Sequence, residues 1–187
     1  MKLNSFQNWL QNDLLRFLIS ITPAVLAGLI LYILGPKIYL PVSAVVSSFY
    51  FAVGVGWITS PIVGLSTGIN PVWLVLLLIF ISTESSLIVS LNYDLLEKIP
   101  LIGRFMRWIR KKAEKVIEKH ELARDVEYVS IFWLMFVPIY GTGPMIMTMV
   151  GRLLSLNWKK TWLTITLSAT ARFTIIIILL YVGWISL

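Results

Sequence analysis

The apolar run at residues 136–151 (FVPIYGTGPMIMTMVG) is long enough for a buried helix, but proline and glycine interrupt it near its middle. Proline removes a backbone donor and clashes with the preceding turn, and glycine loosens the backbone, so a continuous helix is not expected here. In hydrocarbon each freed backbone group costs several kcal/mol, so protein or a water-filled cavity must cover the break. The run therefore predicts an enclosed, partly polar site inside a membrane protein, where half-helix ends meet near the middle of the bilayer.

The composition supports the membrane setting. Of the 187 residues, 58% are hydrophobic and only 13% are charged, and continuous apolar runs occupy residues 72–81 and 174–182. The absence of cysteine excludes disulfides and thiolate metal sites. We expect one all-α integral membrane domain over residues 1–187, with its first helix retained rather than cleaved as a signal peptide.

Seven segments follow from hydropathy and from the positions of glycine and proline. They are an interfacial helix over 1–13, spans over 14–35, 71–92 and 158–186, a basic amphipathic helix over 98–125, and two interrupted apolar segments over 39–68 and 129–152. The segment 39–68 allows two interpretations, one long kinked span or a re-entrant hairpin.

The distribution of Lys and Arg discriminates between two topologies. If every apolar segment spans the membrane, ten Lys and Arg lie inside and five outside. If the two interrupted segments are hairpins that return to the side they entered, three helices span the membrane. Fourteen Lys and Arg then lie inside, and one, Lys37, lies outside. Because cytoplasmic segments carry an excess of Lys and Arg, the second topology is preferred, with the N-terminus and the basic segment on the cytoplasmic side of the inner membrane. Its two hairpin–helix units form an inverted repeat.

A basic segment contains nine of the 16 Lys and Arg, between Lys98 and Arg124. Next to membrane spans, a basic and partly apolar helix typically lies on anionic lipid headgroups, so we expect lipids rather than nucleic acid as its partner. The residues predicted to form this surface are Arg104, Arg107, Arg110, Lys111, Lys112 and Lys115.

Glu84 and Arg172 are the two charges predicted to lie deep in the hydrocarbon, each far from the ends of its helix. Such residues usually face inward and mark substrate or ion pathways. Glu84 is interpreted as a proton carrier or cation ligand, or as a structural acid with a polar partner. Arg172 is interpreted as a ligand for a phosphate or carboxylate, and the alternative is a permanent ion pair with Glu84.

The interrupted run also contributes candidate site residues. Gly141, Thr142 and Gly143 are interpreted as presenting backbone N–H groups to an anion, and the alternative is that small residues only permit close packing. Pro138 marks the break, and Tyr140 is interpreted either as a substrate ligand or as an anchor of the tip. The single histidine, His120, lies among charged residues without metal-ligand spacing, so neither a metal nor a cofactor is expected.

Over residues 71–187 the chain resembles the DedA/VTT group of membrane proteins and, more closely, the small multidrug export family. The resemblance rests on IPLIGR at 99–104 with the following basic stretch, PIYGTGP at 138–144, NWKK at 157–160, Arg172 and YVG at 181–183. The hairpin motif of the family reads roughly P-x-P-G-T-G-A, so Pro138, Gly141, Thr142 and Gly143 match, whereas Tyr140 and Pro144 do not. Two features depart from the DedA pattern. DedA proteins usually have acidic residues in the first hairpin, whereas 39–68 carries no charge, and Gly141 stands near the position where they have an arginine.

The resemblance implies opposed re-entrant hairpins, homodimers and ion-coupled transport of amphiphilic drugs, polyprenyl-phosphates or phospholipid headgroups. From the residues and the resemblance together we expect a transporter or lipid flippase that works by alternating access. The alternative is a non-transporting scaffold or assembly factor that acts through the basic helix. An enzyme is not expected, because one histidine, one deep acid and no cysteine offer little catalytic machinery.

Overall fold

The computed structural model describes residues 2–52, 55–100, 103–104, 107, 124–136, 143–154 and 156–185. Within these ranges the regular structure is helical, without strands. Three helical segments are long and apolar enough to cross a membrane, namely Leu15–Leu34, Pro71–Leu91 and Trp158–Gly183. They lie in the three predicted spans. Large apolar side chains such as Leu18, Ile33 and Leu179 are exposed on them, as expected of a multi-pass membrane protein whose solvent is lipid.

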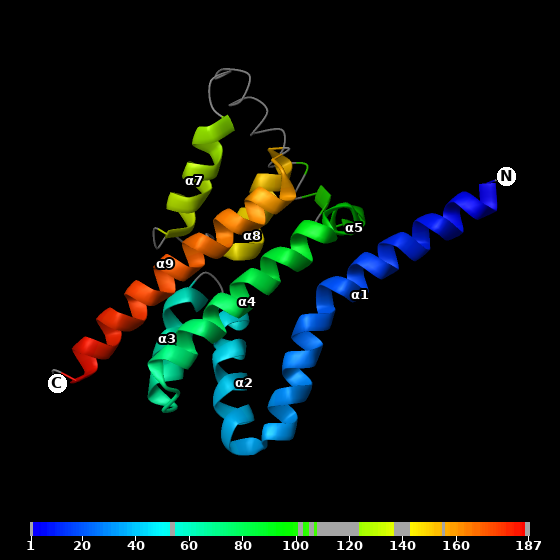
Figure 1. Cartoon of the computed structure of the whole chain (residues 1–187). Helices are drawn as coiled ribbons and strands as arrows, with labels where there is room; N and C mark the ends of the chain where they lie inside the picture. Colours follow the sequence, from blue (N-terminus) through cyan, green and yellow to red (C-terminus); the bar gives the residue numbers. More distant parts are fainter. Residues whose placement is uncertain are drawn as a thin grey trace.

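The first helix, α1 (Lys2–Leu34), continues from the predicted interfacial segment 1–13 into the predicted span 14–35 without a break. Pro23 lies inside it, and proline removes one hydrogen bond of the helical ladder. Figure 1 shows α1 bending about halfway along its length, which is the usual consequence of an internal proline. The helix stops at Gly35, whose φ of 88° is readily adopted only by glycine.

Segment 39–68 forms two helices, α2 (Pro36–Phe51) and α3 (Gly56–Ser66), which fold back on each other (Figure 1). The hydroxyl of Ser48 donates to the hydroxyl of Thr59 across the pair at 2.9 Å. A Cβ on Gly56 would collide with the backbone carbonyl of Phe49, so only glycine permits this approach. Of the two interpretations of the segment, the structure has the geometry of a helical hairpin.

The interrupted segment 129–152 is also formed by two helices, which extend slightly beyond it at both ends. They are α7 (Arg124–Phe136) and α8 (Pro144–Leu153). They contact each other, and α8 lies between α4 (Pro71–Leu91) and α9 (Trp158–Ile185). Helix α8 begins where the sequence predicts a restart, because Gly143 is its N-cap and Pro144 its first residue. The residues between the two helices, 137–142, lie outside the described ranges.

Helices α4 and α9 form the centre of the molecule, and the two hairpins approach them from opposite ends (Figure 1). Both α4 and α9 begin after an asparagine that caps the helix. The Oδ1 atom of Asn70 accepts from the Val72 amide at 2.9 Å, and that of Asn157 accepts from the Lys159 amide at 3.0 Å. Between them lies the main apolar core, which includes Leu74, Leu78, Ile165, Ala169 and Phe173. This arrangement places Ala52 and Gly56 of the first hairpin, and Gly143 and Pro144 of the second, beside the middle of α9.

The basic amphipathic helix predicted over 98–125 lies largely outside the described residues. A short helix, α5 (Tyr93–Lys98), follows α4, and the described side chains of Arg104 and Arg107 are exposed. Their exposure is compatible with a headgroup surface and does not test one.

Candidate functional site

A small pocket of about 190 Å³ lies where the two hairpins meet α9. The first hairpin and its turn contribute five lining residues, the second hairpin four and α9 two. They are Phe49, Tyr50, Ala52, Gly56 and Trp57; Met135, Gly143, Pro144 and Ile146; and Arg172 and Phe173. Of the predicted site residues, Gly143 and Arg172 line this pocket.

Arg172 is the charged residue in the lining of this pocket, and its side chain is only 2% exposed. Its Nη1 atom donates to the carbonyl oxygen of Met135 at 2.7 Å, and its guanidinium carbon lies 4.3 Å from the centre of the Trp57 ring. Among the described residues, Nε and Nη2 have no hydrogen-bond partner. Because a buried charge needs both a counter-charge and hydrogen-bond acceptors, these two donors can bind an anion that enters the pocket.

The start of α8 adds a second positive feature to the same pocket. Gly143 and Pro144 both line the pocket. Gly143 has an extended conformation and is the N-cap of α8, and Pro144 is the first residue of that helix. The N–H groups of a first helical turn lack intrahelical acceptors, and the helix dipole makes this end electropositive. A Cβ on Gly143 would meet no atom within 4 Å, so the backbone here is not closely covered by the described residues. Helix end and guanidinium together favour an anion in this pocket.

Glu84 is also buried, with 6% exposure, but it lies elsewhere. Its carboxyl group lies against the backbone of Ala24 in α1 and close to Tyr50, and it does not line the pocket of Arg172. Its Oε1 atom has no hydrogen-bond partner within the described part of the chain. The structure has no ion pair between Glu84 and Arg172, so the predicted alternative of a permanent pair is not what this conformation contains.

Hydroxyl groups of α4 connect both hairpins to the centre of the molecule. The hydroxyls of Tyr50 in α2 and Ser85 lie 2.7 Å apart, and the hydroxyl of Thr148 in α8 donates to that of Ser86 at 2.8 Å. Serine and threonine side chains commonly join helices inside membranes in this way. Tyr50 lines the pocket of Arg172 and also lies near Glu84.

Several site residues were missed by sequence reasoning. Trp57 was not among the predicted site residues, but its ring stacks on the buried guanidinium of Arg172. Tyr50, Met135 and Phe173 were not singled out at all. The available signal for Tyr50 was its position inside an apolar segment, because a buried tyrosine hydroxyl usually requires a hydrogen-bond partner.

The remaining predicted site residues lie partly outside the described ranges. Gly143 lies in the pocket lining. Pro138, Tyr140, Gly141 and Thr142 fall outside the described residues, as do Arg110, Lys111, Lys112 and Lys115 of the predicted headgroup surface. Over the described ranges, no group of three or more His, Asp or Glu side chains is arranged to hold a metal ion.

Comparison with known proteins places the chain in a family. The family model described as "Putative small multi-drug export protein" matches residues 43–175, a range that includes Tyr50, Glu84 and Arg172. No curated protein and no solved structure matches the chain. The wider likeness to the DedA/VTT group rests on the sequence motifs alone. Because the match extends over well more than half of the chain, this protein belongs to the small multi-drug export protein family.

Proposed function

We propose that this membrane protein transports an amphiphile with an anionic group, and that Arg172 binds this group in the pocket between the two hairpins and α9. The family assignment supports a transporter-like protein. The observation that supports an anionic substrate is the buried guanidinium of Arg172. Two of its nitrogen donors have no partner among the described residues. A cationic substrate would be repelled by this charge, because the two would lie close together in a medium of low dielectric constant.

The size and lining of the pocket support a headgroup rather than a whole amphiphile as the bound part. A volume of about 190 Å³ is small compared with drug-binding pockets of roughly 300–1,000 Å³. The walls beside Arg172 are apolar and aromatic, formed by Phe49, Trp57 and Phe173. The apolar part of the substrate would remain in the surrounding lipid while its anionic group pairs with Arg172.

Alternating access would come from movement of one hairpin–helix unit against the other. The units α2–α3–α4 and α7–α8–α9 repeat the same order of elements, and the pocket takes its lining from both. In the topology preferred by the distribution of Lys and Arg, the hairpins are re-entrant and the two units are inverted, as in many transporters. The N-terminus then lies on the cytoplasmic side of the inner membrane.

Glu84 fits a coupling role in this proposal better than a role in substrate binding. It is buried, its Oε1 atom lacks a partner among the described residues, and it lies near Tyr50, which lines the substrate pocket. A carboxyl group in such a place can carry a proton or hold a cation. The proposed process moves the substrate without breaking a bond, so the protein is not an enzyme in this scheme.

Transport into vesicles by the purified protein tests the proposal. A fluorescent anionic amphiphile and a cationic amphiphile are compared for the wild type, Arg172→Gln and Arg172→Lys. We expect Arg172→Gln to lower transfer of the anionic probe at least about tenfold, because hydrogen bonds to a charged group contribute about 1.5–3 kcal/mol. Arg172→Lys should retain part of the activity, since it keeps the charge and loses the planar guanidinium.

Arg152→Gln is the matched control, because it removes an arginine that lies over the Tyr93 ring and outside the pocket. Equal transfer by Arg172→Gln and wild type would contradict the anion site. If no probe moves while the protein stays folded, the transporter proposal fails and the scaffold alternative is favoured. Joint replacement of Arg107, Arg110, Lys111 and Lys112 then tests the basic segment as the working surface.

A further inference from the structure

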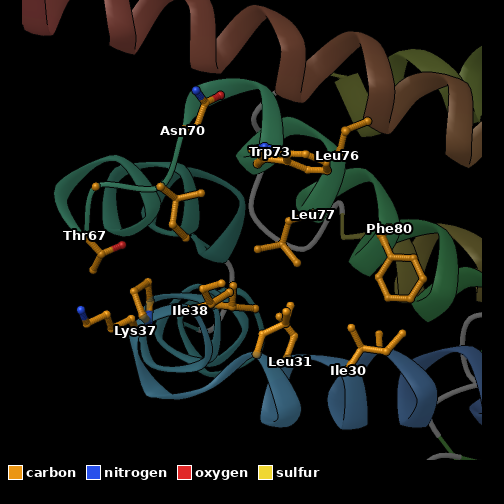
Figure 2. Close-up of a pocket in the computed structure, with 16 residues that line it drawn as sticks. Ile30, Leu31, Lys37, Ile38, Thr67, Asn70, Trp73, Leu76, Leu77 and Phe80 are labelled. Atoms are coloured by element: carbon orange, nitrogen blue, oxygen red, sulfur yellow. The ribbon is translucent and has the colours of Figure 1, made fainter.

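A second cavity, larger than the pocket of Arg172, lies elsewhere in the described part of the molecule. A groove of about 720 Å³ lies between α1, α2 and the first half of α4, and the turn from α3 to α4 closes one end of it. Figure 2 shows Ile30 and Leu31 of α1 facing Leu77 and Phe80 of α4 across this space. These side chains make the body of the groove apolar.

Polar groups gather at one end of the groove. Lys37, at the start of α2, is the charged residue in its lining, and Figure 2 places it near Thr67, on the side of the groove where Asn70 also lies. The Oδ1 atom of Asn70 is occupied as the cap of α4, which leaves its Nδ2 group as a donor. The hydroxyl of Thr67 donates to carbonyl oxygens of α3, so its oxygen contributes an acceptor.

We propose that this groove binds one anionic phospholipid, with an acyl chain along the apolar body and the phosphate beside Lys37. The apolar lining fits a hydrocarbon chain, and the charge at one end selects the sign of the headgroup. Lys37 and Asn70 flank the turns at which α1 passes into α2 and α3 into α4, so the polar end of the groove lies at the same end of the molecule as these turns. A lipid headgroup at the membrane surface reaches this end while its chain remains at membrane depth.

The lipid site is separate from the transport pocket, because the two share no lining residue. The inference therefore goes beyond the proposed function and does not depend on it. Its readout is binding, which can succeed or fail whether or not the protein moves a substrate.

Native mass spectrometry of the full chain tests the inference. The protein is released from micelles containing phosphatidylglycerol or phosphatidylcholine with identical acyl chains, and the bound lipid is counted. We expect the wild type to retain phosphatidylglycerol in preference to phosphatidylcholine. Lys37→Gln should reduce phosphatidylglycerol retention about fivefold, to the level of phosphatidylcholine, because one basic residue near a headgroup contributes about 1 kcal/mol.

A second variant tests the apolar body of the groove. Leu31→Trp should reduce retention of both lipids, since Leu31 lines the groove and the indole would fill it. Leu29→Trp is the matched control, because Leu29 lies on the same helix, is exposed and does not line the groove. Arg16→Gln is the charge control, since it removes an exposed cation outside the groove.

Two results would overturn the inference. One is equal retention of the two lipids by the wild type, which would mean that Lys37 selects no headgroup. The other is unchanged retention in Leu31→Trp while its helical circular dichroism matches that of the wild type, which would mean that no chain occupies the groove.

Discussion

The two hairpin–helix units of this protein share an order of elements but differ in charge and in packing. The long helix of the first unit, α4, carries Glu84, and that of the second, α9, carries Arg172. In the first hairpin, Gly56 packs directly on the backbone of Phe49, whereas Gly151 in the second hairpin faces the side chain of Thr161. Among the described residues, the two helices of the first hairpin also contact each other more extensively than α7 and α8 do. The second unit supplies the charge that the first hairpin helps to enclose.

This difference shows that neither unit contains the site alone. Arg172 comes from the second unit, but Trp57, which covers its guanidinium, comes from the first. The carbonyl oxygen that accepts from Arg172 belongs to Met135 of the second hairpin. A change in the relative position of the units would change the surroundings of Arg172, which is what alternating access requires.

The largest expected effect concerns the packing of the first hairpin. Gly56→Ala should lower the free energy of unfolding by about 3 kcal/mol, because the new Cβ would overlap a backbone carbonyl that cannot move aside. Gly151→Ala should lower it by only about 1 kcal/mol, since the side chain of Thr161 can shift. Titration with SDS in mixed micelles measures both values. Gly28→Ala is the control and should not lower the free energy of unfolding, because a Cβ there would meet no atom within 4 Å. Equal losses for Gly56→Ala and Gly151→Ala would remove the contrast between the hairpins.

The caps of the two long helices provide a smaller comparison. Asn70→Ala and Asn157→Ala should each lower the free energy of unfolding by about 1 kcal/mol, because each removes the acceptor for a first-turn amide. Asn157→Ala should be the more harmful, since Pro71 already favours the start of α4. The same SDS titration measures the losses. Asn157→Asp keeps the acceptor, so a loss as large as that of the alanine variant would contradict the capping role.

Smaller still are the hydroxyl contacts that join each hairpin to α4. Tyr50→Phe removes the contact of the first hairpin with Ser85, and Thr148→Val removes that of the second hairpin with Ser86. Each should cost about 0.6 kcal/mol, the average for such contacts in a membrane protein. Thr170→Val is the control, because its hydroxyl is exposed and bonds only within α9. Losses no larger than that of the control would mean that these contacts do not hold the hairpins to α4.

The smallest expected effect is the coupling between the two deep charges. Because the structure contains no ion pair between Glu84 and Arg172, the effects of Glu84→Gln and Arg172→Gln on unfolding free energy should add to within about 0.5 kcal/mol. A double-mutant cycle measures this coupling. A coupling of several kcal/mol would restore the interpretation of a permanent pair, since breaking a buried pair leaves one charge uncompensated.

Much of the architecture could be predicted from the sequence. Long apolar runs located the three helices that can span a membrane, and the prolines and glycines of 39–68 and 136–151 located the interruptions. The distances of Glu84 and Arg172 from the ends of their segments predicted that both are deeply placed, and both are buried. These features depend on position along one chain segment, which hydropathy and backbone chemistry report directly.

The lateral neighbours of each helix were decided only by the tertiary structure. In lipid the outer face of a helix is as apolar as its buried face, so hydropathy carries little information about which side meets which partner. For this reason the sequence left open whether Glu84 pairs with Arg172, and it did not place Trp57 at the candidate site. The structure instead separates the two charges, stacks Trp57 on Arg172 and opens a groove beside Lys37. The sequence by itself determined where these residues lie along their apolar segments, and packing of the helices determined what they face.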